Sequence, residues 1–453
     1  MTKSSNDTMA PFKIVILMFN IAIFFSILYL SPFEPTLAKG LSIFVFIAVL
    51  WLTEVFHVSI TSLLVPVLAV LLGIFDVTTA LVEFSNPIIF LFMGGFALAA
   101  AMHKHKLDQL IASKLIILAK GHMLYSSFLV FGLTAFSSMW ISNTATIAMM
   151  MPLVIGLLSR LDFRLHKSTY LYFLLGTAYS GSIGGMGTLI GSPPNAIAAS
   201  AINIGFTEWM LFGIPMVLVS LPVMVSVLYI CLRPQIHNRI EVFQAPFEMT
   251  RASKKVALIF FCTVLCWMFS KPLSNTLGIE GNIDALVAIA AVIALSGSHV
   301  VTWKEISEST DWGVLVLFGG GITLSSILKV TGTSLLLAEG IMSLIYDVPL
   351  PAFILLTIAF VVFLTELVSN TASTALLVPI FISIADSMQL SSPTMAIIIA
   401  LSASCAFMLP VATPPNAIVF GTGYVPQKDM MQVGFRLNLV LITMVSALAM
   451  VFI

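Results

Sequence analysis

Two apolar segments of the chain carry the same small polar motif. The first reads FSSMWISNTATIAMMMP (136–152) and the second reads FLTELVSNTASTALLVP (363–379). Serine, threonine and asparagine are costly in apolar surroundings unless they hydrogen-bond or bind a ligand. The repeated Ser-Asn-Thr motif (SNT below) therefore indicates that both copies need polar groups within an apolar segment.

The composition explains what surrounds these motifs. The 453 residues are 59% hydrophobic and only 9% charged, whereas soluble domains carry about 25% charged residues. This predicts an all-α polytopic membrane protein, with lipid as the solvent for most of the chain. The net charge is zero, which argues against nucleic acid as a partner. The four cysteines form no CxxC pair, and we interpret them as small apolar residues.

Apolar segments of membrane-spanning length recur along the chain. Eleven are uninterrupted and lie near 12–30, 41–56, 58–75, 87–101, 169–200, 210–232, 253–270, 282–298, 312–330, 395–420 and 432–453. Two more, near 123–151 and 351–381, are interrupted by the SNT motifs. The chain thus has either 13 spans, or 11 spans and two re-entrant hairpins.

The basic residues favour the second alternative. With 11 spans and the N-terminus inside, 17 of the 20 Lys and Arg residues are cytoplasmic, and only Lys39, Lys271 and Lys329 lie outside. Such a bias is what the positive-inside rule expects. If both interrupted segments crossed fully, five basic residues between 233 and 255 would move outside. The stretch 101–120 is then expected to form an amphipathic helix on the inner membrane surface.

The chain is also duplicated. Three pairs of segments match in the same order: LFMGG (91–95) with LFGGG (317–321), the two SNT segments, and GSPPNAIA (191–198) with ATPPNAIV (412–419). In the 11-span arrangement one extra N-terminal helix precedes two units, each with five spans and one hairpin. An odd number of spans inverts the second unit, and inverted repeats are typical of secondary transporters with a site at the bilayer midplane.

The repeated motifs suggest two kinds of ligand. The double prolines at 193–194 and 414–415 break their helices within the membrane. Helix N-termini offer N–H groups and partial positive charge to an anion, whereas unwound turns offer carbonyl oxygens to a hard cation such as Na⁺. The alternative is that Ser, Thr and Asn only join helices together, which explains one SNT motif better than two. Glu366 stands where the first copy has Met139, and an intramembrane carboxylate is a functional candidate.

These motifs identify a family resemblance over essentially the whole chain. The paired SNT motifs, the paired Pro-Pro-Asn motifs and the 11-span arrangement resemble the divalent anion:sodium symporters, the INDY-type bacterial carriers. The resemblance implies sodium-coupled import of C4-dicarboxylates such as succinate, malate and fumarate. It also implies a homodimer whose transport domain moves as an elevator against a scaffold domain, with Na⁺ as coupling ion and no organic cofactor.

The resemblance further implies which residues bind these ligands. The first Na⁺ site would use Ser138, Ser142, Asn143 and Gly191, and the second Thr365, Ser369, Asn370 and Ala412. The substrate carboxylates would contact Asn143, Thr144, Ser192, Asn370, Thr371 and Thr413.

The domain boundaries follow in the same way. The scaffold would comprise 1–120 and 253–345, the transport domain 121–232 and 346–453, and a cytoplasmic linker 233–252. The expected location is a bacterial inner membrane, with the N-terminus cytoplasmic and the C-terminus periplasmic.

Two alternative functions stay open: a citrate or sulfate carrier of the same family, and an anion channel. We find no HExxH, GxSxG or GxxxxGK[ST] motif, and therefore do not expect an enzyme.

Overall fold

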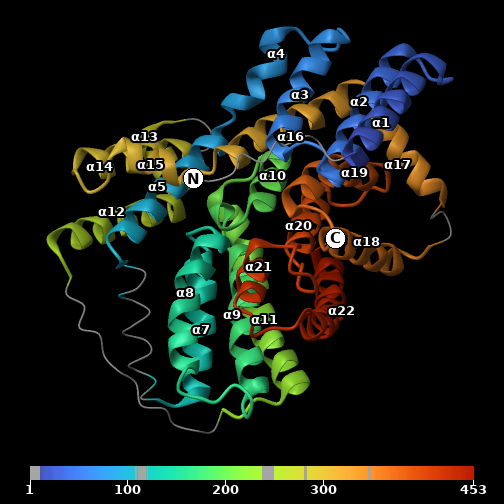
Figure 1. The fold of residues 1–453 in the computed structure, drawn as a ribbon. Helices are drawn as coiled ribbons and strands as arrows, with labels where there is room; N and C mark the ends of the chain where they lie inside the picture. Colours follow the sequence, from blue (N-terminus) through green and yellow to red (C-terminus); the bar gives the residue numbers. More distant parts are fainter. Residues whose placement is uncertain are drawn as a thin grey trace.

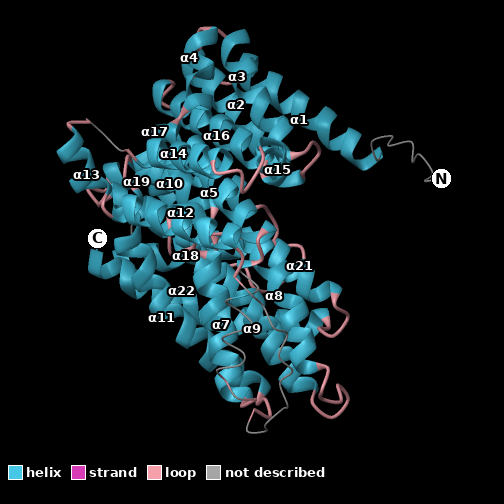
Figure 2. Cartoon of the chain, turned by 90° about the vertical axis from the view of Figure 1, so that its left-hand side faces the viewer, coloured by secondary structure: helices cyan, strands magenta, loops and turns pink. Residues whose placement is uncertain are grey.

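The computed structural model describes residues 11–107, 110, 119, 121–236, 249–279, 283–344 and 348–452. These residues form helices and no strands, as Figures 1 and 2 show. The helices are α1 (Pro11–Leu30), α2 (Pro35–Thr53), α3 (Val58–Leu71), α4 (Val77–Leu81), η1 (Val82–Ser85), α5 (Pro87–Lys104), α7 (Met123–Ser138), α8 (Asn143–Leu158), α9 (Lys167–Gly185), η2 (Leu189–Gly191), α10 (Pro193–Ile202), α11 (Phe206–Leu232), α12 (Arg251–Met268), α13 (Ser270–Leu277), α14 (Asp284–Gly297), α15 (Trp303–Ser309), α16 (Trp312–Val330), α17 (Thr333–Leu344), α18 (Leu350–Thr365), α19 (Asn370–Ser387), α20 (Ser392–Ala403), α21 (Pro414–Gly421) and α22 (Gln427–Phe452).

The helices are strongly apolar, as the composition predicts. Within the described residues, six helical segments are long and apolar enough to cross a membrane, namely α1, α2, α4 to α5, α11, α16 and α22. A seventh is formed if α12 and α13, which are bent by 79°, count as one span. The other predicted spans fall on short helices (α3, α14) or on interrupted ones (α9 to α10, α20 to α21). An all-helical membrane protein is therefore confirmed, whereas eleven spans stay a prediction.

The duplication is visible in where the helices begin. The starts of α7 and α18 are as far apart in the chain as those of α8 and α19, and the pairs α10 and α21, and α11 and α22, likewise share one spacing. α7 and α8 lie side by side in the lower part of Figure 1, and the SNT motif lies at the turn between them. α18 and α19 enclose the second SNT motif in the same way. A helix of 16 residues, such as α7 or α18, is about 24 Å long, which is less than the roughly 30 Å of hydrocarbon in a bilayer.

The two halves of the chain interlock. α5 of the first half packs on α14 of the second, and the equivalent helices α16 and α3 form the matching pair. Both contacts depend on a glycine: a Cβ at Gly94 would lie 2.6 Å from Ala288 Cβ, and a Cβ at Gly320 would lie 2.5 Å from Ser62 O. Small residues allow such close helix approach in membranes. The repeated LFMGG and LFGGG segments are therefore explained by packing.

The core is centred on α9 and α20. All side chains of α9 from Thr169 to Gly185 are buried, as are those of α20 from Thr394 to Ala403. Only Asn20 and Phe24 are buried in α1, whose remaining surface is apolar and suits lipid contact. The two enclosed helices end shortly before the Pro-Pro-Asn segments begin, so buried, closely packed helices support the interruptions that follow them.

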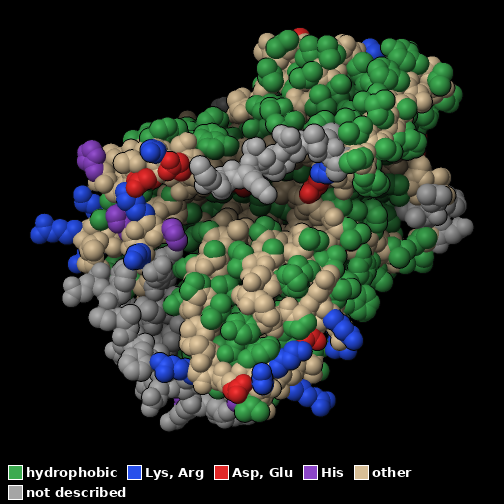
Figure 3. Space-filling view, in the orientation of Figure 1, with side chains coloured by type: hydrophobic (Ala, Val, Ile, Leu, Met, Phe, Trp, Pro, Cys, Tyr) green, Lys and Arg blue, Asp and Glu red, His purple; other side chains and the backbone are tan. Residues whose placement is uncertain are grey.

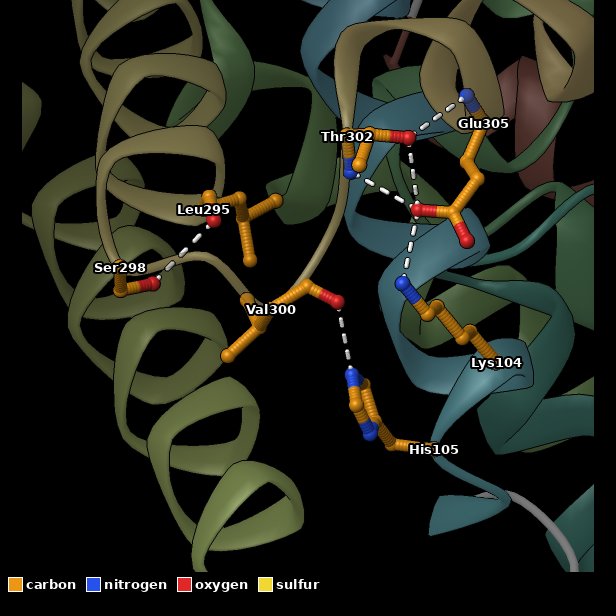
Figure 4. Close-up of polar contacts among 7 residues, drawn as sticks. All are labelled: Lys104, His105, Leu295, Ser298, Val300, Thr302 and Glu305. Atoms are coloured by element: carbon orange, nitrogen blue, oxygen red, sulfur yellow. Dashed lines mark hydrogen bonds and ion pairs between the residues drawn. The ribbon is translucent and has the colours of Figure 1, made fainter.

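Polar contacts join the last residues of α5 to α15 (Figure 4). Lys104 Nζ lies 2.7 Å from Glu305 Oε2, which also accepts hydrogen bonds from the Thr302 amide and hydroxyl. The Lys104 ammonium and the Thr302 donors lower the pKa of Glu305 from 4.5 to about 2. Because the pKa is lower in the folded state, this stabilisation is present above pH 4.5 and is lost as the pH falls toward 2. His105 Nε2 lies 2.8 Å from Val300 O nearby.

Residues 101–104 of the predicted amphipathic helix belong to the end of α5. The rest of that prediction lies mostly outside the described residues, as does the middle of the predicted linker 233–252.

The tight glycine contacts give a stability prediction. Gly320→Ala places a methyl group against the α3 backbone, so it is expected to destabilise the protein by about 1–3 kcal/mol through overpacking. Gly297→Ala is the matched control, because a Cβ at Gly297 would meet nothing within 4 Å. Thermal unfolding of the purified protein in detergent measures both. A midpoint for Gly320→Ala equal to that of Gly297→Ala would contradict the packing described here.

Candidate functional site

Four helices begin at one place in the structure. The residues that precede them are Ser142 before α8, Ser192 before α10, Ser369 before α19 and Thr413 before α21. All four border one cavity of about 980 Å³. Each repeat contributes one hairpin turn and one Pro-Pro-Asn helix start, so the site is built twice from equivalent elements.

The local sequence explains why the helices begin here. Ser and Thr are favoured N-cap residues: Ser142 Oγ accepts from Ala145 N at 3.4 Å, and Thr413 Oγ1 accepts from Asn416 N at 3.3 Å. Prolines occupy the first two positions of α10 and α21, where a missing N–H costs nothing. The first N–H groups of α8 and α19 keep no partner within their own helices. These two helix starts are therefore the ones that offer N–H donors to the cavity.

The cavity contains no lysine or arginine among its described lining residues. Its charged lining consists of Glu54, Glu308 and Asp311, and His103 lies there too. A horizontal furrow runs between the upper and lower parts of the molecule in Figure 3, where the cavity lies. Helix N-termini carry partial positive charge, so an anion bound here would be stabilised by backbone dipoles and by any cation bound beside it.

The structure brings most of the predicted site residues together. All six predicted substrate contacts border the cavity: Asn143, Thr144, Ser192, Asn370, Thr371 and Thr413. Six of the eight predicted cation ligands border it: Asn143 and Asn370 again, and Ser142, Gly191, Ser369 and Ala412. Ser138 and Thr365 do not, because both are fully buried behind the hairpin turns. Their ligand roles stay predictions.

Oxygen atoms converge around Asn143. One end of its side-chain amide lies 2.5 Å from Ser138 Oγ and 3.2 Å from the carbonyl oxygens of Gly181 and Gly191. Three oxygens facing one point suit the amide nitrogen of Asn143, which can donate to them. A cation at the first predicted Na⁺ site would take the place of this end of the amide, and that site stays a prediction.

Two glycines make this cluster possible. A Cβ at Gly185 would lie 2.5 Å from Asn143 Oδ1, and a Cβ at Gly191 would lie 2.5 Å from Gly185 O and 3.0 Å from Ser138 O. No larger residue fits at either position without moving its neighbours. The glycine-rich end of α9 thus lets backbone carbonyls approach one another closely, as a cation site requires.

The equivalent residues of the second repeat are Asn370 and Thr365. The side-chain Oδ1 of Asn370 is buried and has no hydrogen-bond partner, which is costly unless a ligand supplies one. Thr365 Oγ1 donates to Val362 O at 3.0 Å within its own helix, so its oxygen lone pairs remain available. Asn370 and Thr365 correspond to Asn143 and Ser138 of the first cluster when the two SNT segments are aligned.

The asparagines of the Pro-Pro-Asn motifs have a role that the sequence analysis did not assign. Asn195 Nδ2 donates to Gly185 O at 2.8 Å and to Thr188 O at 2.7 Å. Asn416 Nδ2 makes the equivalent bonds to Ala406 O at 3.1 Å and Leu409 O at 3.0 Å. Each asparagine therefore holds the unwound segment of its own repeat in shape. The sequence did hold a sign of this role, because the asparagine recurs at the same place in both Pro-Pro-Asn motifs.

The opposite wall of the cavity was also not predicted. It comes from the end of α2, from α5 and from the segment between α15 and α16, and includes Glu54, Phe96 and Val314. Nothing repeats at these positions, and a helix end with one acidic residue is common in any membrane protein. Only the fold brings these residues to the cavity.

A protein family described as citrate transporter matches residues 48–393. The chain belongs to the citrate transporter family. Two curated relatives, from Staphylococcus saprophyticus and from Staphylococcus aureus strain USA300, are named sodium-dependent dicarboxylate transporter SdcS. They are 31% and 33% identical to this chain, and the matches cover 92% and 88% of it and 88% and 83% of those proteins. These relatives confirm the resemblance to the divalent anion:sodium symporters.

One further relative and one solved structure are similar to this chain. An uncharacterized transporter of Haemophilus influenzae is 50% identical over 97% of this chain and 96% of its own length. The crystal structure of the Alcanivorax borkumensis YdaH transporter matches the fold with a TM-score of 0.61 at 16% identity, covering 91% of this chain and 97% of that one. This family of chains consists of transporters, and the present fold is a transporter fold.

The asparagine contacts yield a prediction. Asn195→Asp replaces the Nδ2 donor with an oxygen that faces two carbonyl oxygens, so it is expected to destabilise the protein by about 1–3 kcal/mol. Asn416→Asp should have the same effect in the second repeat. Asn275→Asp, at an exposed position of α13, is the control. Thermal unfolding in detergent is the measurement, and an unchanged midpoint in both variants would show that these bonds do not hold the unwound segments.

Proposed function

We propose that the protein is a sodium-coupled symporter that imports C4-dicarboxylates such as succinate, malate and fumarate. The observation that carries this proposal is the cavity at four helix starts, with no lysine or arginine in its described lining, beside the oxygens around Asn143 and the unpartnered Oδ1 of Asn370. Helix N-termini suit the carboxylates, and backbone and side-chain oxygens beside them suit Na⁺. The names of the staphylococcal relatives, sodium-dependent dicarboxylate transporters, support both ligands.

In this proposal the asparagines couple the two ligands. Asn143 and Asn370 each belong to a helix start that borders the cavity; the amide of Asn143 faces three oxygens, and the Oδ1 of Asn370 is buried and open to a ligand. A Na⁺ ion held by Ser138, Ser142, Asn143 and Gly191, and another held by Thr365, Ser369, Asn370 and Ala412, would each fix an asparagine in place. Both ions would supply positive charge that no lysine or arginine of the described lining provides. The dianion then binds well only when Na⁺ is bound, which is the definition of coupling.

The way substrate crosses the membrane is proposed as an elevator. Residues 121–232 and 346–453 would form the moving transport domain, with 1–120 and 253–345 as the scaffold and 233–252 as the linker. The cavity lies between parts of both, because α2, α5 and α15 to α16 border it on one side and the hairpin turns on the other. Those ends of α2, α5 and α15 are cytoplasmic by the positive-inside rule. We therefore interpret the structure as an inward-facing state.

The remaining features of the proposal follow from the family. They are 11 spans in two inverted units, a homodimer formed through the scaffold, and a bacterial inner membrane with the N-terminus in the cytoplasm and the C-terminus in the periplasm. Citrate is the second candidate substrate, because the matching family is described as citrate transporter. A sulfate carrier and an anion channel are the other outcomes that an uptake experiment can reveal.

Uptake into proteoliposomes tests the function. Radiolabelled succinate is expected to accumulate above its external concentration only with an inward Na⁺ gradient, because the described cavity lining has no lysine or arginine to balance the dianion. Citrate and sulfate are added as competitors, which ranks the three anions. Equal accumulation when choline replaces Na⁺ would rule out sodium coupling. If succinate only equilibrates across the membrane, both with the Na⁺ gradient and in choline, the protein would be a channel.

The shared asparagines give a second prediction for the same system. Asn143→Ala and Asn370→Ala are each expected to weaken both Na⁺ and succinate binding, with coupling free energies of about 1–3 kcal/mol that are equal in either direction. Titration of each ligand at several concentrations of the other measures this coupling. Asn275→Ala, far from the helix breaks in the chain, is the control. A variant that loses succinate affinity with unchanged Na⁺ dependence would show that the two sites are separate.

A further inference from the structure

The unwound segments between α9 and α10 and between α20 and α21, called the helix breaks here, are held by equivalent contacts. In both, the asparagine of the Pro-Pro-Asn motif binds two carbonyls of the unwound segment. In both, a glycine of the following long helix lies against the break: a Cβ at Gly213 would be 2.5 Å from Met186 O, and a Cβ at Gly434 would collide with Phe407 O. The alignment that pairs the Pro-Pro-Asn motifs also pairs these residues. Because these contacts are shared, a contact found in one repeat alone points to a property of that repeat.

The breaks differ in how each is joined to its hairpin turn. In the first repeat the Thr188 hydroxyl donates to the carbonyl oxygen of Met139 at the turn. In the second repeat the residue equivalent to Thr188 is Leu409, which has no hydroxyl, and the residue equivalent to Met139 is Glu366. In the second repeat the break and the hairpin turn are therefore joined by other hydrogen bonds, in which backbone N–H groups of the break donate to the Glu366 side chain at the turn.

The Glu366 carboxylate collects a set of N–H donors from the second break. It accepts from Phe407 N at 2.7 Å, from Met408 N at 2.9 and 3.0 Å to its two oxygens, and from Leu409 N at 3.1 Å. Asn438 Nδ2 of α22 donates to it at 2.7 Å. Consecutive backbone N–H groups form anion-binding nests, and here the anion belongs to the chain itself.

The donor from α22 is also specific to the second repeat. Asn438 is equivalent to Val217, so the first repeat has the apolar pair Met139 and Val217 where the second has Glu366 and Asn438. Glu366 is 3% exposed and Asn438 is fully buried. A buried carboxylate is costly unless hydrogen bonds satisfy it. Asn438 therefore supplies one of the donors that satisfy the buried Glu366, and Glu366 supplies the acceptor for Asn438.

We infer that Glu366 is a positioning residue for the second cation site, which it holds in shape by binding the backbone of residues 407–409. The inference rests on the proposed function. Glu366 follows Thr365 directly, and the segment that it binds leads into Ala412, so both ends of the predicted second site are attached to this carboxylate. The negative charge also favours a cation nearby. The first repeat has Met139 in place of this carboxylate, so the first site lacks this support.

A set of variants tests the inference. Glu366→Gln removes the charge at equal size, and Glu366→Met with Asn438→Val installs the apolar pair of the first repeat. Each is expected to raise the Na⁺ concentration for half-maximal succinate uptake by at least about tenfold, the size expected for losing hydrogen bonds to a charged group. Succinate affinity at saturating Na⁺ should change by less than about twofold, because the substrate contacts remain. Glu34→Gln, at an exposed position between α1 and α2, is the control.

Cys405 provides a readout that is independent of transport. It is fully buried two residues before Phe407. In a background where Cys231, Cys262 and Cys266 are serine, N-ethylmaleimide should modify Cys405 at least about tenfold faster in both Glu366 variants than in the parent. Glu366→Asp, which keeps the charge, should recover part of both effects.

The outcomes separate the inference from the proposed function. A folded Glu366→Gln protein with parental Na⁺ dependence would overturn the inference, and so would a double variant that behaves as the parent does. If Glu366→Gln does not fold, Asn438→Ala serves in its place, because it removes one donor and should shift the Na⁺ dependence in the same direction by less. Absence of Na⁺-dependent uptake in the parent itself would refute the proposed function, while Cys405 modification would still report whether Glu366 holds the break.

Discussion

Backbone polar groups must be satisfied wherever a chain lies away from water, and this constraint determines the structure around the cavity. α9 and α20 end in the middle of the protein, so their last carbonyls and the following N–H groups need partners there. Asn195 and Asn416 supply donors for the carbonyls, and Glu366 supplies an acceptor for three N–H groups. The N–H groups that begin α8 and α19 at the cavity have no partner within their own helices. The backbone groups that are left open are therefore those at the cavity.

The glycines show how packing and chemistry are joined in this fold. Gly185 and Gly191 allow carbonyl oxygens to converge, and Gly213 and Gly434 allow the long helices α11 and α22 to lie directly on the breaks. The unwound segments are consequently enclosed by helices and held on several sides. An irregular backbone that is surrounded in this way keeps a fixed geometry, and a cation site needs such geometry because its ligands are backbone oxygens.

Much of this arrangement could be predicted from the sequence, for a physical reason. SNT and Pro-Pro-Asn are local motifs whose effect on the backbone is fixed by residue type: a serine caps a helix and a proline begins one. Their duplication alone pairs Asn143 with Asn370, and Ser192 with Thr413, as members of one site. The contacts of Glu366 with residues 407–409 could not be predicted, because they join residues 41 to 43 positions apart in the chain. The cavity wall around Glu54, Phe96 and Val314 likewise depends on how separate helices pack.

The location of the cavity bears on how related carriers can diverge. In the proposed mechanism the residues that contact the substrate, Asn143 and Asn370, belong also to the cation clusters, so a substitution there alters both ligands at once. Residues such as Phe96 and Val314 border the cavity on the other wall and belong to neither cluster. Selection for a new transported anion can act on that wall without loss of ion coupling. Divergence in substrate choice is then expected among the single, unrepeated residues, while the duplicated motifs stay the same.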